Sequence, residues 1–445
     1  MSNKQTLFCG NNAEFLSAEL TKESNSSNGA PAFRIPSLVN ADGTLVAVAD
    51  KACTGSDWGF IELAVRTSTD NGKTWSDLKT IATPPAREIN SNVDNTATAF
   101  FIDPCMTVAP NGDIVLLVTF FPESKGFHNQ KILENKKVAY TEYNGAACPL
   151  IYDRDGKFYI VSQDGTVVDS KNNDTMYTCN FSTGELKKGD EYVGNIFLNG
   201  AVGKSESDTG TTFGAPLKAP KRSYIFMLKS SDKGATWTEP KDITGSLLNL
   251  DTDGAFLAVA PGTGLTTESG RIIFPLYTKK GTVAVYSDDN GETFRRNTVI
   301  PFAAGQGEWV PVQAPTGDLY GFSRTKKYKK IHTSVSTDNG LVWVGSKSAK
   351  VKAPCCQKNA LVIGDKVYVS HPNSKKRENG VISVGTFTYN KKGKFKGIKW
   401  DKKTDIKVNE GFFAYSCMAK IDDKTVGILY EDQPSSHIVF ETISL

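Results

Sequence analysis

Ser68-Thr69-Asp70-Asn71-Gly72-Lys73-Thr74-Trp75 is an eight-residue stretch that occurs four times in this chain, with small variations. The other copies run from Ser230 to Trp237, from Ser287 to Phe294 and from Ser336 to Trp343, and in the last of them Val342 replaces the threonine. A single Asp-x-Gly turn arises by chance in many β-rich proteins. Four copies that share Ser, Asp, Gly and an aromatic residue form an internal repeat.

Each copy reads as a tight turn between two β-strands. The aspartate accepts hydrogen bonds from the backbone that follows it, glycine adopts the positive φ of a reversal, and the aromatic ring packs between strands. The copies that begin at residues 230, 287 and 336 are 57 and 49 residues apart, close to the length of a four-stranded antiparallel sheet with its turns. Radial repetition of such sheets predicts an all-β fold, a β-propeller.

Runs of alternating apolar and β-branched residues, with almost no helical period, predict six blades. We place the blades at about residues 34–85, 100–245, 255–300, 308–350, 355–400 and 412–445. The repeated turn then lies in the last hairpin of each of the first four blades. We expect Gln5 to Cys9 to close the ring with one more strand, because an open sheet edge invites wrong pairing.

The second blade is too long for four strands, and the excess falls between its second and third strands. We expect residues 129–200 to form a small β insert, with residues 1–128 and 201–445 forming the propeller. Within the insert, Pro149 to Ser170 reads as a meander with turns at Asp155-Gly156 and Asp164-Gly165. A long irregular loop is the alternative.

The size and composition of the chain suit a large globular protein with many short strands. It has 445 residues, 39% of them hydrophobic, with 39 glycines and 19 prolines. No apolar run reaches the roughly 18–20 residues that cross a bilayer, and Met1 to Asn11 lacks the regions of a signal peptide. A net charge of +4 mildly favours anionic ligands. We expect no membrane span and no nucleic acid partner.

The sequence gives no indication of a metal or a cofactor. Its eight cysteines include no C-x-x-C pair and no nearby histidine, so buried free thiols are the expected state. The four histidines show no metal-ligand spacing, and no phosphate-binding glycine-rich loop opens a helix. We therefore expect a protein that works without a metal and without a cofactor.

Arginine is scarce in this chain, with ten among 52 basic residues, so we expect an arginine in an apolar context to have a specific role. Arg34 lies in an expected innermost strand, Arg324 ends the run Leu319 to Ser323, and Arg377 lies in the loop from His371 to Gly380. One such arginine is more often part of a structural ion pair. Three from different blades could converge at the propeller axis and bind one carboxylate by multidentate hydrogen bonds.

The repeated turns and the stretch Phe33-Arg34-Ile35-Pro36 resemble the Asp boxes and the FRIP motif of exo-sialidases (neuraminidases) of the bacterial and trypanosomal type. The resemblance covers nearly the full length, including an insert in the second blade as in clostridial enzymes. It implies that Arg34, Arg324 and Arg377 form the triad that binds the carboxylate of sialic acid. It also implies that Glu431, in Leu429-Tyr430-Glu431, holds the first of these arginines.

The resemblance implies catalytic roles for three further residues. Tyr415 matches the nucleophile, Glu308, sixteen residues before Arg324, matches its general base, and Asp57, six residues after Lys51, matches the general acid/base. The anomeric carbon of sialic acid carries its own carboxylate, which would repel a carboxylate nucleophile, so a tyrosine is needed and the configuration is retained. Taken one at a time, Tyr415 would more often be a core aromatic, Glu308 a surface charge and Asp57 a turn residue.

Substrate-binding residues carry over as well. Asp103, in Ile102-Asp103-Pro104, matches a residue that hydrogen-bonds O4 and the amide region of the sugar, while Phe127, Phe256 and Tyr277 fall near positions that line the N-acetyl and glycerol pockets. Lys51 departs from the family, which usually has a further arginine there. We expect contacts to the O4 side of the sugar to be weaker or differently aimed, because lysine lacks the planar fork.

Trans-sialidases place aromatic residues beside the acceptor sugar, one of them just ahead of the last triad arginine. Here Ser374-Lys375-Lys376 occupies that position and His128 the other candidate position, which favours hydrolysis over transfer. The resemblance thus implies a retaining exo-α-sialidase that releases terminal sialic acid from glycoproteins, oligosaccharides or gangliosides. The alternatives are a trans-sialidase, an intramolecular trans-sialidase that makes an anhydro sugar, and a sialic-acid-binding propeller without activity. We expect a monomer, in the extracellular or cell-surface setting that this substrate suggests.

Overall fold

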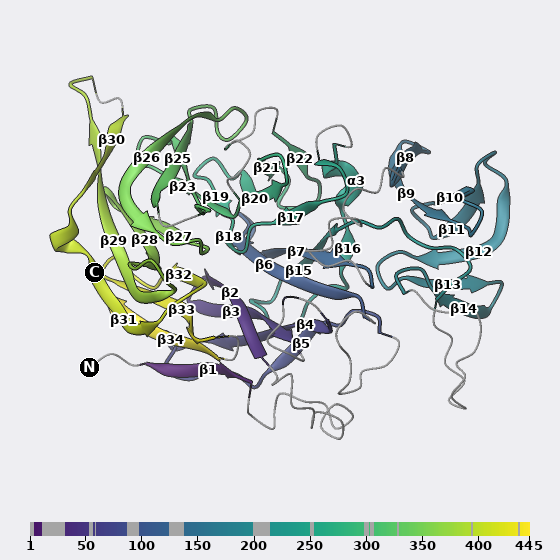
Figure 1. The fold of residues 1–445 in the computed structure, drawn as a ribbon, viewed down its shortest axis with the longest axis horizontal. Coiled ribbons are helices and arrows are strands. Elements are labelled where there is room, and N and C mark those ends of the chain that lie inside the picture. Colours follow the sequence, from purple (N-terminus) through teal and green to yellow (C-terminus); the bar gives the residue numbers. More distant parts are fainter. Residues whose placement is uncertain are drawn as a thin grey trace.

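The computed structural model describes residues 4–10, 32–52, 57, 59–86, 98–123, 138–198, 214–249, 253–297, 302, 307–326, 329–392, 395–434 and 437–445. In this part of the chain six sheets form the blades of a propeller, and a seventh sheet lies to one side (Figure 1). The predicted all-β, six-bladed propeller with an insert in its second blade is confirmed. The candidate sugar-pocket residue Phe127 and the candidate acceptor position His128 lie outside the described residues.

The first three blades follow the chain from one strand to the next. The first consists of β2 (Ala32–Ala41), β3 (Thr44–Ala52), β4 (Ile61–Ser68) and β5 (Lys79–Ala82). The second consists of β6 (Phe100–Val108), β7 (Ile114–Phe121), β15 (Tyr224–Ser230) and β16 (Lys241–Asp242), with β18 (Gly262–Thr263) parallel to β6. The third consists of β17 (Leu257–Val259), β20 (Ile272–Thr278), β21 (Thr282–Ser287) and β22 (Arg295–Arg296), and β19 (Leu265–Thr266) also pairs with β20.

The remaining blades complete the ring. The fourth consists of β23 (Trp309–Gln313), β24 (Leu319–Ser323), β25 (Lys329–Ser336) and β26 (Val344–Ala353). The fifth consists of β27 (Asn359–Ile363), β28 (Lys366–Pro372), β29 (Glu378–Tyr389) and β30 (Phe395–Trp400), with β31 (Ile406–Phe412) paired to β29. The sixth consists of β32 (Ser416–Lys420), β33 (Thr425–Gln433), β34 (His437–Ser444) and β1 (Gln5–Cys9).

Strand β1 closes the ring by pairing antiparallel with β34, as the sequence predicted. Leu7 and Phe8 bury their side chains in the core between the first and last blades, and the Phe8 ring lies 5.2 Å from that of Phe33 in β2. The two ends of the chain thus meet in one sheet, and the outer edge of the sixth blade is covered.

The insert is a seven-stranded antiparallel sheet between β7 and β15 of the second blade. Its strands are β8 (Tyr140–Tyr143), β9 (Ala146–Tyr152), β10 (Phe158–Val161), β11 (Thr166–Asp169), β12 (Asp174–Asn180), β13 (Glu185–Lys188) and β14 (Glu191–Asn195). Figure 1 shows it at the right-hand end of the molecule, far from β30 and β31 at the left. The short helices α3 (Thr244–Leu247) and η2 (Lys402–Thr404) accompany the sheets. Among the described helices, none has the length and hydropathy to cross a bilayer.

The four Asp boxes form the same hydrogen-bonded turn. In each, the serine Oγ accepts a hydrogen bond from the glycine N–H at 2.8–2.9 Å and donates one to the aspartate. The aspartate also accepts from the backbone N–H four residues further on. In the first three boxes a threonine hydroxyl adds a bond to the same carboxylate, whereas Val342 of the fourth supplies only its N–H.

The glycine of each Asp box also touches the preceding blade of the ring. Its φ lies between +80° and +89°, a region that favours glycine. A β-carbon on Gly72 would overlap the ring of Phe440 in the sixth blade, and one on Gly340 would lie 2.7 Å from Ile273 in the third. The corresponding pairs in the other two boxes are Gly234 with Val46 and Gly291 with Val115. The turns therefore set the close approach of neighbouring blades.

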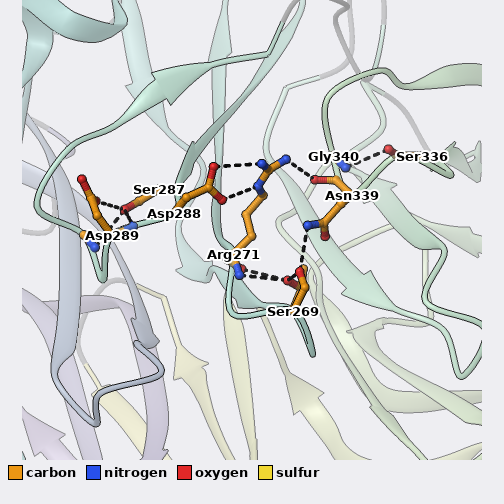
Figure 2. Close-up of polar contacts among 10 residues, drawn as sticks. Ser269, Arg271, Ser287, Asp288, Asp289, Ser336, Asn339 and Gly340 are labelled. Atoms are coloured by element: carbon orange, nitrogen blue, oxygen red, sulfur yellow. Dashed lines mark hydrogen bonds and ion pairs between the residues drawn. The ribbon is translucent and has the colours of Figure 1, made fainter.

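Arg271 links the Asp boxes of the third and fourth blades (Figure 2). Its guanidinium group donates two hydrogen bonds to the carboxylate of Asp288, at 2.7 and 2.9 Å, and one to the carbonyl oxygen of Asn339 at 3.0 Å. The Asn339 amide in turn donates to Ser269 Oγ at 2.9 Å, and the guanidinium group stacks 4.4 Å from the Tyr286 ring centroid. A planar, five-donor group can make these contacts at once, which a lysine could not.

We predict that Gly72→Ala destabilises the protein more than Gly43→Ala. Both glycines lie in the first blade, with φ of +83° and +82°, so both variants carry the same backbone cost of about 1 kcal/mol. Only the new β-carbon at Gly72 meets a neighbour, the Phe440 ring, since nothing lies within 4 Å of that at Gly43. Chemical denaturation should show a further loss of about 1–3 kcal/mol in the free energy of unfolding. Equal losses would contradict the inter-blade role of the turn.

Candidate active site

Charged and aromatic side chains from four blades, the first, fourth, fifth and sixth, meet at one end of the propeller. The residues are Arg34 in β2, Asp57 after β3, Glu308 and Arg324 beside β23 and β24, Arg377 before β29, Tyr415 before β32 and Glu431 in β33. Backbone hydrogen bonds hold together the segments from which several of these side chains project. The Arg324 N–H donates to the Glu308 carbonyl at 2.7 Å, and the Glu431 N–H donates to the Tyr415 carbonyl at 3.0 Å.

Tyr415 lies at the centre of this group. Its hydroxyl donates a hydrogen bond to Glu308 Oε1 at 2.6 Å and accepts one from Arg324 Nη1 at 2.8 Å. The same Arg324 nitrogen donates to Glu308 Oε2 at 2.6 Å. The guanidinium carbons of Arg34, Arg324 and Arg377 lie 5.7, 5.9 and 5.5 Å from the centroid of the Tyr415 ring. Three cations therefore surround one phenol, within the range of cation–π attraction.

The protonation state of Tyr415 follows from its surroundings. Burial raises the pKa of its hydroxyl well above the usual value, Arg324 lowers it, and the neighbouring Glu308 raises it again. The side chain is only 6% exposed. The phenol is therefore neutral at physiological pH and is already hydrogen-bonded to a carboxylate that can accept its proton.

Arg34 is held by two acidic residues. Its guanidinium group forms ion pairs with Asp57 and with Glu431, whose Oε1 lies 3.4 Å from Arg34 Nε. Burial opposes the charge of Arg34, but Glu431 and Asp57 outweigh this effect and raise its pKa. Glu431 also accepts a hydrogen bond from the N–H of Ile35, whose φ of +55° accompanies an irregularity in β2. This kink turns the arginine of the FRIP motif toward the axis.

Asp103 and Tyr277 form a hydrogen-bonded pair that interacts electrostatically with this group. The Tyr277 hydroxyl donates to Asp103 Oδ2 at 3.5 Å, and burial, Glu308 and Asp57 raise the pKa of the Asp103 carboxyl well above its usual range. Asp103 has a φ of +66° at an irregularity in β6, which is uncommon for a residue other than glycine. Phe256 is buried, with its ring edge-to-face against Tyr277 at 5.5 Å, so it supports that ring from behind.

Among the described residues, the contacts of the Lys51 side chain lie outside this group. Its Nζ contacts Glu62 Oε2 at 2.9 Å and Thr80 Oγ1 at 3.1 Å, within the sheet of the first blade. Side chains alternate along β3, so Asp50, directly opposite Arg34, shares a face with Ala52 and not with Lys51. Burial and the nearby Asp103 raise the pKa of the Asp50 carboxyl, while Arg34 lowers it. Asp50 is thus a further acidic neighbour of the group, and it was not among the site residues predicted from the sequence.

The segment 354–358 supports the group and was not predicted from the sequence. Cys355 contacts Arg324 through its sulfur, 3.4 Å from Nε, and through its carbonyl oxygen, 3.5 Å from Nη2. The Gln357 side chain donates to the Ser416 carbonyl at 3.1 Å and accepts from the Ser416 N–H at 3.1 Å, which fixes the residue after Tyr415. Cys355 is exposed, so the expectation of buried thiols is wrong at this position. Five other described cysteines are buried, and Cys9 is partly exposed.

Lys358 is an ionisable side chain buried beside the group. Its Nζ donates to the Cys356 carbonyl at 2.8 Å, and burial lowers its pKa to about 8. Below pH 8 the folded protein carries the charge of Lys358 at a cost in stability. Between pH 8 and the unfolded-state pKa of 10.5, Lys358 binds fewer protons in the folded state than in the unfolded state. The contribution of Lys358 to stability therefore rises with pH in this window.

We predict that this effect appears when the wild type is compared with Lys358→Met. The free energy of unfolding of the wild type, minus that of the variant, should rise by about 2 kcal/mol between pH 7 and pH 9.5. Methionine removes the charge and keeps an unbranched chain of similar length. Denaturation of both proteins across this range measures the difference, and a flat difference would contradict the lowered pKa of Lys358.

Comparison with known proteins places the chain in a family. Residues 35–301 match one BNR repeat-like domain, and residues 199–427 match a second. The chain belongs to the BNR repeat-like family. The likeness extends to curated sialidases, so the resemblance drawn from the Asp boxes and the FRIP motif is confirmed.

Two curated relatives align over most of the chain. The anhydrosialidase of Macrobdella decora is 28% identical over 91% of this chain and 58% of its own length. Sialidase B of Streptococcus pneumoniae is 26% identical over 94% of this chain and 64% of its own length. The chain therefore spans less than two thirds of the length of these relatives.

Solved structures agree on the fold. The NanB sialidase of Streptococcus pneumoniae superposes with a TM-score of 0.78 at 24% identity, over 95% of this chain and 70% of that one. The intramolecular trans-sialidase of Ruminococcus gnavus gives a TM-score of 0.78 at 23% identity, over 95% of this chain and 96% of that one. The propeller of this chain is thus the propeller of sialidases.

Proposed function

We propose that this chain is a retaining exo-α-sialidase, in which Tyr415 is the nucleophile, Glu308 its general base and Asp57 the general acid/base. The observation that carries the proposal is the phenol of Tyr415, hydrogen-bonded to Glu308 at 2.6 Å and surrounded by three guanidinium groups. The names of its curated relatives, an anhydrosialidase and a sialidase, support the substrate class.

Three arginines around one aromatic ring suit a substrate with a carboxylate next to its reacting carbon. Like charges so close together repel, and an anionic ligand relieves this repulsion. Arg34, Arg324 and Arg377 come from different blades, so they can reach one carboxylate from three directions. The anomeric carbon attached to that carboxylate would then lie over Tyr415.

The chemistry of the first step requires a nucleophile that approaches without negative charge. The raised pKa keeps the Tyr415 hydroxyl protonated until attack, when its proton passes to Glu308 as the oxygen bonds to the anomeric carbon. Arg324 contacts both partners, at 2.8 Å from the hydroxyl and 2.6 Å from the carboxylate. It stabilises the negative charge that moves from Glu308 to the phenol oxygen during the step.

Asp57 suits the second role, that of an acid and base at the open side of the site. Its side chain is 45% exposed, in contrast to the buried Glu308, so it can meet both a leaving group and water. It would donate a proton to the glycosidic oxygen and then remove one from the water that releases the sugar from Tyr415. Two displacements at one carbon give net retention.

Asp103 and Tyr277 are proposed to bind the sugar beside the reacting carbon. The raised pKa of Asp103 keeps its carboxyl group protonated to higher pH, so that it can both donate and accept hydrogen bonds to hydroxyl and amide groups. Phe256 would act through the Tyr277 ring that it supports. Lys51 would act through Glu62, with which it is paired, and not by touching the sugar.

We predict that Tyr415→Phe lowers kcat on an aryl sialoside by about 10³-fold or more, because it removes the nucleophilic oxygen. Tyr286→Phe is the matched control, since the Tyr286 ring lies under Arg271, which links two Asp boxes. Its kcat should stay within about twofold of the wild type. Initial rates measure both variants, and activity of Tyr415→Phe near the wild-type value would disprove the assignment.

A second candidate function, an intramolecular trans-sialidase, is favoured by the names of two similar proteins. One curated relative is named an anhydrosialidase, and one structure with a TM-score of 0.78 is titled an intramolecular trans-sialidase. In that reaction a hydroxyl group of the bound sugar, instead of water, would displace Tyr415, and an anhydro sugar would leave. Both functions use the same first step.

Proton NMR of the products from sialyllactose separates the two functions. We expect free sialic acid as the first product, and no transfer to a second sugar, because Ser374, Lys375 and Lys376 ahead of Arg377 provide no aromatic acceptor platform for that sugar. An anhydro sugar as the first product would establish the second candidate. A sialyllactose signal that depends on added lactose would indicate transfer to an acceptor.

A further inference from the structure

Positive charge is concentrated in one part of this chain. Residues 324–410 carry 21 Lys and Arg against 6 Asp and Glu, a net charge of +15, although the whole chain has only +4. The rest of the chain is therefore acidic, at −11. Such asymmetry within one protein directs anions toward one region of its surface.

The structure places much of this charge along the outer edge of the fifth blade. Lys396 and Lys399 lie in β30, Lys402 and Lys403 in η2, and Lys375 and Lys376 in the loop before β29. All six side chains are exposed, and together we call them the lysine rim. Figure 1 shows β30 and β31 at the end of the molecule opposite the insert.

The lysine rim leads away from the candidate active site. Lys375 and Lys376 directly precede Arg377, and the end of β31, at Phe412, pairs with Glu378 beside it. Ile406, at the start of β31, pairs with Ile382, and Lys399 pairs with Thr386. At about 3.4 Å per residue along β29, the rim extends for about 30 Å from the site.

The rim has more lysines than neighbouring acids, although Asp401 and Asp405 flank η2 and Asp405 interacts electrostatically with Lys402. None of its six lysines forms an ion pair in the described structure, and the ion pair nearest to them along the chain joins Lys407 to Glu410 at 3.9 Å. Lysines do protect exposed sheet edges from pairing with other chains. That role explains Lys396 and Lys399 in the edge strand, but not those in η2 and in the loop beside Arg377.

We propose that the lysine rim binds polyanionic, multiply sialylated glycan chains and holds them beside the active site. The proposal rests on the proposed function, because it takes its ligand from the same substrate class. Lysines are separate point charges on flexible stems and do not form a fixed fork, which suits a polymer of spaced carboxylates. A chain held by the rim would present successive terminal sugars to the arginine triad, at a rate that falls with ionic strength.

The experiment compares two triple variants with equal changes in charge. Lys399→Glu, Lys402→Glu and Lys403→Glu together alter the rim; Lys171→Glu, Lys187→Glu and Lys188→Glu together alter exposed lysines of the insert. On a densely sialylated mucin at low salt, we expect the rim variant to lower kcat/KM by about threefold to tenfold and the insert variant by less than twofold. On sialyllactose both should stay within about twofold of the wild type, and at about 0.5 M NaCl the loss on mucin should disappear.

The other outcomes test the proposal and the function on which it rests. Equal losses in the two variants would show that net charge matters and the rim does not. A parallel loss on sialyllactose would show damage to the site.

If the wild type cleaves neither substrate, the proposed function fails, and binding to sialylated and desialylated mucin surfaces then tests the rim separately. A preference for the sialylated surface that only the rim variant loses would support the rim, and equal binding to both surfaces would overturn it.

Discussion

The site depends on holding three guanidinium groups around one buried phenol. Arg34, Arg324 and Arg377 lie within 6 Å of the centroid of the Tyr415 ring, and such crowding of cations is costly unless anions balance it. Glu308 offsets the positive charge of Arg324, and the carboxylates of Asp57 and Glu431 offset that of Arg34. Glu308 and Asp57 also have chemical tasks in the proposed reaction, whereas Glu431 holds Arg34 in place. The electrostatics that make the site stable are therefore the electrostatics that make it reactive.

The propeller makes this arrangement possible because its inner strands converge on one axis. The Asp boxes also help to set the spacing of the blades, since glycines such as Gly72 and Gly340 let adjacent blades approach closely. Arg271 ties two of these turns together, and β1 closes the ring. A small change in the spacing between blades would move the arginines relative to each other. The repeat thus positions the chemistry without taking part in it.

Much of the site could be predicted because it lies in short motifs with a local signature. The FRIP stretch identified Arg34, and family spacing identified Glu308 and Arg324. Other partners have no such signature. Lys51 was expected at the sugar, but alternation along β3 directs it to Glu62, and Cys355 contacts Arg324 from a segment 31 residues away. These contacts depend on strand register and on packing between blades, which a linear pattern does not contain.

The sequence by itself determined the architecture: four copies of one turn, regular strand runs and an N-terminal strand without a blade of its own specify a closed propeller. These features follow from local φ preferences and the two-residue period of strands. Only the tertiary structure decided which side chains meet. Tyr415 and Glu308 are 107 residues apart and hydrogen-bond at 2.6 Å, because separate blades bring them to one axis. The same is true of the lysine rim, whose charges are visible in the sequence, whereas its path from Arg377 along the fifth blade follows from the pairing of β29 with β30 and β31.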